Sequence, residues 1–399
     1  MNSSTIVDFD EQMDSSMTQA TAVLRQFKKV TTKVVALVPA YNEEDIIEQT
    51  IDSLMRQTYA FAYVLVIANN CKDRTVEIVK QLQRDTYGYD QLRLVEMDNN
   101  PGKKSGALNY GFDLLEDDVD LVFCMDSDTI VDEKMIEMGV YKFGLRSERN
   151  TGGICSAYRA LPLKKEANKW QRFLWRIQNI EFGLANAWRI ENYKSARVLP
   201  GVSVMYRMEA LRDVQRYRLS KDPNDKTVWA TNCLVEDYLL TLELKDIGWG
   251  AKSSHEMVSW SDVPLKLNGK GGLFDQRARW YSGTIDVVRP RMLARNSRYE
   301  VFTISLLMLN LFMRVLLYGT YAALLISGTH IELLTWFLVL PVIAASTQYY
   351  RLMKYADQLD RWQKFFTLTL VVNELYAIYR EVLYAYSIWL SFARPNRAW

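Results

Sequence analysis

Two aspartates one residue apart are the residues of this sequence whose types and spacing most clearly suggest chemistry. Asp126 and Asp128 follow an apolar run at 121–125 that has the composition of a buried parallel strand. Residues i and i+2 of an extended segment point to the same side, so both carboxylates can face one ligand. Two hard oxygen donors at this spacing suit Mg²⁺ or Mn²⁺ shared with substrate phosphates. The alternative is a strand that ends in an ordinary Asp-rich turn.

The chain around this pair alternates between strand-like and helix-like patterns. The apolar strand-like runs lie at 34–38, 63–68, 92–95 and 121–125, and the helical patterns between them lie at 45–57, 75–83 and 105–115. This alternation indicates βαβ units and a parallel sheet. Ligands of such sheets bind beyond the carboxyl ends of the strands. We therefore expect a nucleotide at that edge, bordered by the turns that follow the first, second and fourth strands.

A glycine turn at 101–105 opens the third helix at the same edge. It contains Gly-Lys-Lys-Ser, which resembles part of a phosphate-binding loop, but Met97 stands where that motif requires its first glycine. This departure argues against an ATPase. Lys104 remains a candidate for contact with a phosphate, and a solvated surface lysine is the alternative.

Composition narrows the classes of function. A formal net charge of +2 over 399 residues implies no basic field for nucleic acid. With only His255 and His330 present, a zinc site built from histidines is nearly excluded. The four cysteines are far apart and form no Cys-x-x-Cys, which is typical of reduced thiols in the cytosol. The first thirty residues have no signal-peptide pattern, and residues 1–32 are expected to be a tail or a short amphipathic segment.

The second half of the chain begins with a long helical pattern at 169–193. Apolar residues recur there at three- and four-residue spacing, and arginines occupy the other side. Such a helix either lies in a membrane interface or covers the sheet as an ordinary amphipathic helix, and the sequence favours neither. Further on, a helix is expected after Glu236 and Asp237, and a glycine pair leads into Gln276 and Arg279.

The end of the chain is apolar. Three long apolar stretches lie at 301–327, 331–349 and 365–392. Each is close to or above the roughly 20 residues that a bilayer requires, which predicts about three transmembrane helices. Basic clusters before the first stretch and between the second and third place the catalytic part in the cytoplasm. Glu374 and Glu381 share a face of the third stretch, and Arg314 in the first is their expected partner.

Five motifs in order give the chain a resemblance to family 2 glycosyltransferases, the membrane-embedded inverting group that includes hyaluronan, chitin, cellulose and poly-N-acetylglucosamine synthases. They are Pro-Ala-Tyr-Asn-Glu-Glu at 39–44, Lys-Ser-Gly-Ala-Leu-Asn at 104–109, Asp-Ser-Asp at 126–128, Val-Glu-Asp at 235–237 and Gln-Arg-Ala-Arg-Trp at 276–280. The last matches the Gln-x-x-Arg-Trp signature of processive β-linking synthases. The chain departs from the pattern at Val235, where many members have Thr, and at Asn69, where many have Asp.

The resemblance covers about residues 33–300 and implies an α/β fold of the GT-A type, with interfacial helices and C-terminal transmembrane helices. The implied domains are a tail at 1–32, a nucleotide-sugar-binding domain at 33–270, an interfacial Gln-x-x-Arg-Trp region at 271–300, transmembrane helices at 301–392 and a tail at 393–399. The protein is then expected in the cell membrane as a multi-pass protein with its catalytic domain in the cytoplasm.

The resemblance also implies roles for individual residues. The donor nucleotide would be bound by Pro39, Tyr41, Glu43, Asn69, Asp73, Lys104, Asp126, Gln276 and Arg279. Asp126 and Asp128 would hold Mg²⁺ or Mn²⁺. Asp237 would take the proton of the acceptor hydroxyl, Glu236 would orient or tune it, and Trp280 would stack on the acceptor sugar. The alternatives are a helix cap for the acidic pair and an interfacial anchor for Trp280.

The activity implied is inverting transfer from a UDP-sugar to a growing β-linked polysaccharide, with membrane lipid as surroundings and no nucleic acid partner. A single transfer to a polyprenyl phosphate or other lipid acceptor is an alternative, which the short membrane region favours and the Gln-x-x-Arg-Trp sequence disfavours. An alternative of another class is a non-catalytic membrane scaffold that keeps the fold. Loss of Asp126, Asp128 or Asp237 would mark such a scaffold, and all three are present.

Overall fold

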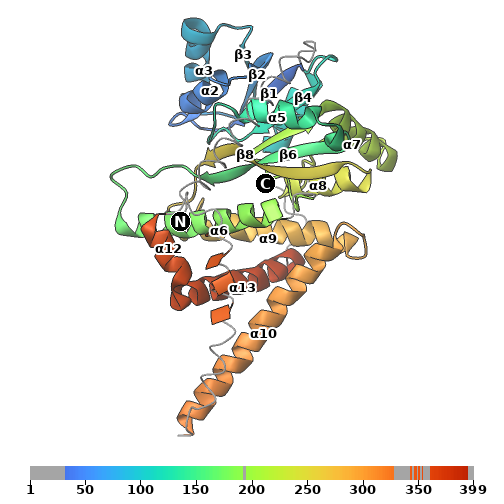
Figure 1. Ribbon diagram of the computed structural model, residues 1–399. Coiled ribbons are helices and arrows are strands. Elements are labelled where there is room, and N and C mark those ends of the chain that lie inside the picture. Colours follow the sequence, from blue (N-terminus) through green and yellow to red (C-terminus); the bar gives the residue numbers. More distant parts are fainter. Residues whose placement is uncertain are drawn as a thin grey trace, which may run out of the picture. The chain divides into compact units, whose positions relative to one another are not determined.

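Eight strands form one sheet, in the order β3-β2-β1-β4-β7-β6-β8-β5 (Figure 1). The strands are β1 (Val34–Ala40), β2 (Tyr63–Asn69), β3 (Leu92–Met97), β4 (Leu121–Met125), β5 (Thr129–Val131), β6 (Thr151–Ala160), β7 (Ser203–Arg207) and β8 (Gly250–Ser261). This computed structural model describes residues 32–191, 195–327 and 360–393, together with residues 342–343, 346–347, 349–350 and 353. The predicted tails at 1–32 and 393–399 lie almost entirely outside the described residues.

Helices connect the strands of this sheet and continue beyond its last strand. They are α2 (Ile47–Met55), α3 (Thr75–Leu82), α4 (Lys103–Asp113), α5 (Met135–Gly144), α6 (Lys169–Glu191), α7 (Met208–Lys221), α8 (Glu236–Asp246), α9 (Leu273–Val288), α10 (Arg298–Ile326), α12 (Arg361–Leu368) and α13 (Leu370–Ala393). Short turns of other helix types occur at Gln83–Tyr87, Arg146–Glu148 and Arg289–Arg291.

The half of the sheet formed by β3, β2, β1 and β4 is parallel, as the βαβ pattern predicts. Strand β1 runs two residues past its predicted end, and Pro39 lies within it, in register with Ile67 of β2. Proline has no N–H for a sheet ladder and is tolerated where a strand is paired on one side only. Pairing of β1 with β4 ends at Leu37, so Pro39 meets that condition.

The other half of the sheet is mixed, so a purely parallel sheet is the wrong description of the whole. Strand β7 is antiparallel to both β4 and β6, β6 is parallel to β8, and β5 is antiparallel to β8. The sequence reasoning missed β6 and β8. Both are rich in Gly, Ala and Ser, with few of the β-branched and aromatic residues that mark strands.

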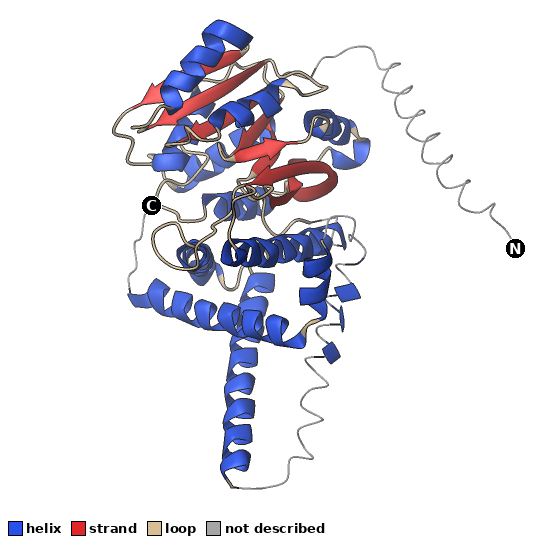
Figure 2. Ribbon diagram, turned by 90° about the vertical axis from the view of Figure 1, so that its left-hand side faces the viewer, coloured by secondary structure: helices blue, strands red, loops and turns tan. Residues whose placement is uncertain are grey.

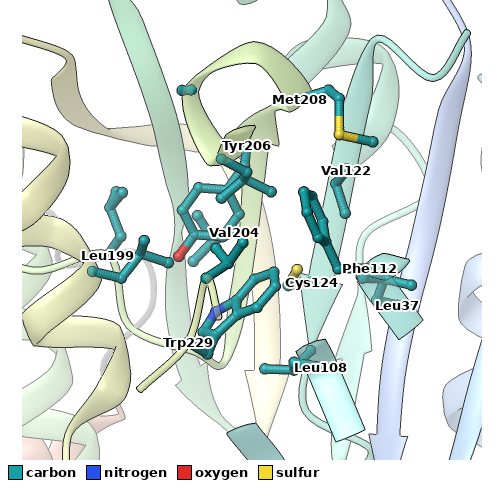
Figure 3. Packing of buried hydrophobic residues seen from close by; sticks show 14 of the residues in the cluster. Leu37, Leu108, Phe112, Val122, Cys124, Leu199, Val204, Tyr206, Met208 and Trp229 are labelled. Atoms are coloured by element: carbon teal, nitrogen blue, oxygen red, sulfur yellow. The ribbon is translucent and has the colours of Figure 1, made fainter. Parts of the chain in front are cut away.

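Each face of the sheet packs against its own layer of helices (Figure 2). Helices α2, α3 and α5 bury apolar side chains on one face, and α4, α7 and α8 do so on the other. The second cluster centres on Trp229, whose ring meets Phe112 edge-on at 6.1 Å and Tyr206 at 6.4 Å between centroids (Figure 3). This core fixes β4, which carries Asp126 at its end, against β7 and α4.

Beneath the sheet in Figure 1 lie α6 and α9, followed by α12 and α13. The long helix predicted at 169–193 is confirmed as far as Glu191. The Ala160 N–H of β6 donates to Asn179 Oδ1 (3.0 Å), and Asn186 Nδ2 donates to the Tyr158 carbonyl (2.8 Å). These contacts support the interpretation in which this helix covers the end of the sheet.

The apolar end of the chain differs from its prediction. Within the described residues, α10 is the one helix long and apolar enough to cross a membrane, over Arg298–Leu324, and it coincides with the first predicted span. The second predicted span, 331–349, falls almost wholly outside the described residues. The third is not one continuous helix, because Thr369 is extended between α12 and α13. Helix α13 instead packs on α9, where Leu383 and Leu390 surround Ala278.

The charged residues of these helices are paired as predicted. Arg314 of α10 forms an ion pair with Glu374, and its Nε lies 2.8 Å from Glu381 Oε2. The Glu381 side chain is only 2% exposed, so an unpaired charge there would be costly. This cluster ties α10 to α13.

Candidate active site

The loops after β1 and β2 form one wall at the carboxyl edge of the sheet. The Glu43 N–H donates to Thr75 Oγ1 (2.8 Å), and the Glu44 N–H donates to Asp73 Oδ2 (3.1 Å). Asp73 Oδ1 also accepts from the N–H of Thr75 (3.1 Å), the first residue of α3. These bonds hold Glu43 and Asp73 side by side, as the prediction of a shared nucleotide site requires. Tyr41 on the same loop is 56% exposed.

A network of asparagines supports the neighbouring turn. Asn69, the buried last residue of β2, accepts from Asn100 Nδ2 at 2.9 Å, and Asn70 exchanges two bonds with the Asn100 backbone at 3.0 and 3.1 Å. A Cβ on Gly106 would come within 2.3 Å of Asn100 Oδ1, so the glycine of Lys-Ser-Gly is needed for this approach. Sequence reasoning missed Asn100, because nothing local marks it. The base contact expected of Asn69 stays a prediction.

Acidic side chains crowd the end of β4. Burial, with the charges of Asp128 and Asp126, raises the pKa of Glu43 to about 8. Burial also raises the pKa of Asp128 to about 7, helped by Asp126 and by Asp262, which follows β8. Asp128 Oδ1 accepts weakly from Thr129 Oγ1 (3.2 Å) and Ser261 Oγ (3.4 Å). Asp262 was not anticipated, because the strand before it was not recognised.

The donor set at this point fits a divalent cation shared with a ligand. In the described part of the chain, no three or more His, Cys, Asp or Glu side chains are grouped so that they would hold a metal ion alone. Asp126 and Asp128 would therefore supply part of an oxygen ligand set, and donor phosphates the rest. The raised pKa of Asp128 shows crowded negative charge that a cation would relieve.

Lys104 connects this cluster with the second acidic pair. Its ammonium forms an ion pair with Asp126 and lies 3.8 Å from Glu236 Oε1. Burial alone would lower the pKa of Lys104, but the carboxylates of Asp126 and Glu236 raise it well above its ordinary value. A Cβ on Gly201 would lie 2.8 Å from Lys104 Nζ, so this glycine leaves room for the ammonium. The solvated-lysine alternative is therefore wrong.

Asp237 lies at the start of α8, held by two backbone N–H groups. Its Oδ2 accepts from Gly201 (3.0 Å) and its Oδ1 from Tyr238 (2.7 Å). Burial raises the pKa of Asp237, against the opposing effects of Lys104 and the two N–H groups. A helix start by itself favours an ionised carboxylate, and burial opposes that effect here. A cavity of about 10 Å³, roughly one water molecule, lies among Asp237, Glu236 and Lys104.

The Gln-x-x-Arg-Trp segment forms the first turns of α9. Arg279 is half-buried there, which lowers its pKa, while the charges of Glu236, Asp126 and Asp237 oppose that shift. Arg279 is thus close enough for carboxylates of both acidic pairs, Asp126–Asp128 and Glu236–Asp237, to act on its charge. Gln276 and Trp280 both contact Arg277. Gln276 Oε1 accepts a hydrogen bond from Arg277 Nη1 at 2.5 Å, and the Arg277 guanidinium lies 4.2 Å from the centroid of the Trp280 ring. Sequence reasoning gave Arg277 no role, because the motif leaves its position unspecified.

This chain is similar to known glycosyltransferases. Residues 35–214 match the family described as Glycosyl transferase family 2. A poly-β-1,6-N-acetyl-D-glucosamine synthase of Staphylococcus aureus (strain MSSA476) is 26% identical over 255 residues, which are 63% of this chain and 54% of that protein. The protein of the same name from Staphylococcus epidermidis is 24% identical over the same length. This chain spans about half the length of these curated relatives.

Among solved structures, the mannosyltransferase PcManGT from Pyrobaculum calidifontis, in complex with GDP-Man and Mn²⁺, has a TM-score of 0.56. It is 14% identical, and the match covers 94% of this chain and 92% of that chain, so the likeness shows the fold alone, a GT-A-like α/β fold. The family match spans β1 to β7 and includes Asp126, Asp128 and Lys104. On these grounds residues 35–214 form a glycosyl transferase family 2 domain.

Proposed function

We propose that this protein is a membrane-associated inverting glycosyltransferase that transfers a sugar from a UDP-sugar to a growing β-linked polysaccharide. One observation carries the proposal: Lys104 lies between Asp126 and Glu236, so that a candidate metal ligand and the residue next to the candidate base Asp237 share one site. The names of the curated relatives support UDP-N-acetylglucosamine as the first donor to test.

On the donor side, Asp126 and Asp128 would hold Mg²⁺ or Mn²⁺ with the diphosphate. The bound cation supplies positive charge to the leaving nucleoside diphosphate. Arg279, held near the same carboxylates, would add a fixed positive charge at low reorganisation cost. Glu43 and the loop around Asp73 would border the nucleoside, because their backbones are joined at this edge.

On the acceptor side, Asp237 would take the proton of the attacking hydroxyl. Its two backbone hydrogen bonds fix the orientation of the carboxylate. A raised pKa makes this carboxylate a stronger proton acceptor near neutral pH than an ordinary aspartate. A single displacement places the base and the leaving diphosphate on opposite faces of the sugar carbon, which inverts the anomeric configuration.

The proposal is tested by incubating the purified chain with a panel of labelled UDP-sugars and sizing the products. A polymer from UDP-N-acetylglucosamine supports it. A product of one sugar on an extracted lipid would support the lipid-acceptor alternative in its place. If protein that still binds UDP turns over none of the donors, the result supports the alternative of a non-catalytic membrane scaffold and overturns the proposal.

A prediction concerns the acceptor side. Trp280→Ala should shorten or abolish the polymer while changing UDP affinity by less than about tenfold, or roughly 1.4 kcal/mol. The indole offers an apolar face to a pyranose, and its other surroundings include the Arg277 guanidinium at 4.2 Å. Product sizing and UDP titration are measured together, with Trp280→Phe as the control that keeps a ring. Equal losses of UDP affinity and of product length would place Trp280 in the donor site.

A second prediction concerns membrane association. The full chain should stay with membranes after a high-salt wash and require detergent for extraction, because α10 is long, apolar and largely exposed. Membrane fractionation followed by immunodetection measures this. As a control for nonspecific adhesion, Phe312→Glu together with Leu316→Glu on the exposed part of α10 should weaken retention. Recovery of the unaltered full chain as a soluble monomer contradicts the prediction.

A further inference from the structure

Among the described residues, Arg277 is the largest residue whose side chain is fully buried, although it carries a charge. It is 1% exposed. Its Nη2 and Nε donate to Glu181 Oε2 at 2.8 and 3.3 Å, and its Nη1 donates to Gln276 Oε1 at 2.5 Å. Its guanidinium also lies over the Trp280 ring at 4.2 Å from the centroid. One side chain thus contacts two members of the Gln-x-x-Arg-Trp segment and one residue of another helix.

The partner, Glu181, belongs to a helix that is fastened to the sheet. Asn179 accepts a hydrogen bond from β6 and Asn186 donates one to it. In addition, Gln178 Nε2 donates to the carbonyl of Pro264, which follows β8 (2.8 Å). Burial would raise the pKa of Glu181, but Arg277 holds it below its ordinary value, so the carboxylate is ionised at neutral pH. The ion pair therefore sets α9 at a defined distance from the strands that lead to the active site.

A third helix meets the same atom. Tyr376 of α13 donates its hydroxyl to Glu181 Oε2 at 2.8 Å. Helices α6, α9 and α13, which lie next to one another in Figure 1, therefore converge on one carboxylate oxygen. A displacement of α13 would act on Arg277 through Glu181.

We propose that Arg277 is a positioning residue, which holds Gln276 and Trp280 in place relative to Asp126 and Asp237 through its contact with Glu181. The guanidinium is suited to this because its planar N–H groups bind two acceptors at its edge while its face lies on a ring. A lysine ammonium keeps the charge but cannot make these contacts together. The inference rests on the proposed function, since Trp280 matters only where an acceptor sugar binds.

The test compares Arg277→Lys and Glu181→Gln with the parent chain in detergent, using UDP-N-acetylglucosamine. Misplacing a reacting group by about 1 Å can cost on the order of 10²-fold in rate. We expect Arg277→Lys to lower kcat at saturating donor by about 10- to 10²-fold and to shorten the product, with UDP affinity within about threefold of the parent. Glu181→Gln, which keeps an acceptor oxygen but removes the charge, should show a smaller loss of the same kind.

The matched control is another arginine that ties the end of α9 to α13. Arg289 Nη1 donates to the Ser391 carbonyl (3.3 Å), and its guanidinium lies 5.1 Å from the Phe392 ring centroid. Arg289→Lys should keep kcat and product length within about threefold of the parent, inside the effect expected of a misplaced group. Equal losses of kcat and product length in the Arg289 and Arg277 variants would mean that Arg277 only joins helices, as Arg289 does, and would overturn the proposal. Unchanged kcat and product length in Arg277→Lys would do the same.

A second readout works without turnover. The fluorescence of Trp280 is obtained as the difference between the parent and Trp280→Phe, and it is measured again in the Arg277→Lys and Arg289→Lys backgrounds. We expect the difference spectrum to change in the first background only. If it is the same in all three, Arg277 does not hold the indole and the inference is wrong. A parent that transfers no sugar refutes the proposed function, while this spectrum still decides the placement of Trp280.

Discussion

Sugar transfer is expected to fall by at least about 10²-fold when Asp128 is changed to Asn or when a chelator removes divalent cations, because a bound cation supplies several kcal/mol of charge stabilisation. Asp128 is buried beside Asp126, and burial together with the charges of Asp126 and Asp262 raises its pKa to about 7, a crowding of negative charge that a bound cation would relieve. Asp128→Asn should also weaken metal-dependent binding of UDP. Turnover and UDP titration with and without Mg²⁺ or Mn²⁺ measure both effects.

The matched control for this prediction is Asp132→Asn. Asp132 lies just beyond β5, and its carboxylate accepts from the N–H of Lys134 at 3.0 Å. It carries the same charge a few residues away, so its replacement should leave the metal requirement intact. Full turnover by the parent chain in excess chelator would count decisively against the assignment of Asp126 and Asp128.

The first half of the fold follows from the sequence because its signals are local. Strands β1, β2 and β4 are continuous apolar runs, and β1 and β2 are each followed by an amphipathic helix. The strands β6 and β8 lack such runs, and their pairing joins segments about a hundred residues apart. A glycine turn at 200–202 predicts the strand β7 itself, but its antiparallel pairing with β4 and β6 joins distant segments and does not follow from local patterns.

The candidate site divides in the same way. Asp126, Asp128 and Asp237 were predicted because they stand in short motifs at the ends of strands or the start of a helix, and Lys104 brings two of these segments together. Asn100 was missed because its importance comes from side chains about thirty residues away. Gly201 matters only because Lys104 lies against it.

Burial bears on two further features, the ionisation of Asp237 and the environment of helix α13. A helix start favours an ionised carboxylate, but desolvation raises the pKa of Asp237, and only the folded chain reveals how far the side chain is removed from water. Helix α13 lies in the third predicted span; Leu383 and Leu390 pack on α9 while Leu375 and Trp389 are exposed, and the span stays a prediction. An apolar stretch of this length suits a buried helix and a bilayer span alike.

Asp237→Asn is expected to lower turnover by about 10²–10⁴-fold, the usual contribution of a general base, with donor affinity nearly unchanged. Asparagine keeps the shape of the side chain and one acceptor oxygen, so one of the two N–H groups of Gly201 and Tyr238 loses its partner, at a cost of about 1 kcal/mol in stability. Transfer is measured at saturating donor and affinity by UDP titration. Asp246→Asn, at the other end of α8, is the control and should retain transfer.

The pH dependence of transfer distinguishes a proton acceptor from a group that only orients the substrate. The base acts when ionised, and burial raises the pKa of Asp237 in the folded protein. Activity should therefore be lost as pH falls through a value above the ordinary aspartate pKa of about 3.9. At saturating Mg²⁺ or Mn²⁺, which keeps Asp128 ionised, the residual activity of Asp237→Asn should lack that acidic decline, because the titrating group is gone. If the variant turns over within about threefold of the parent, well inside the range for a base, or keeps the same acidic decline, Asp237 is not the proton acceptor.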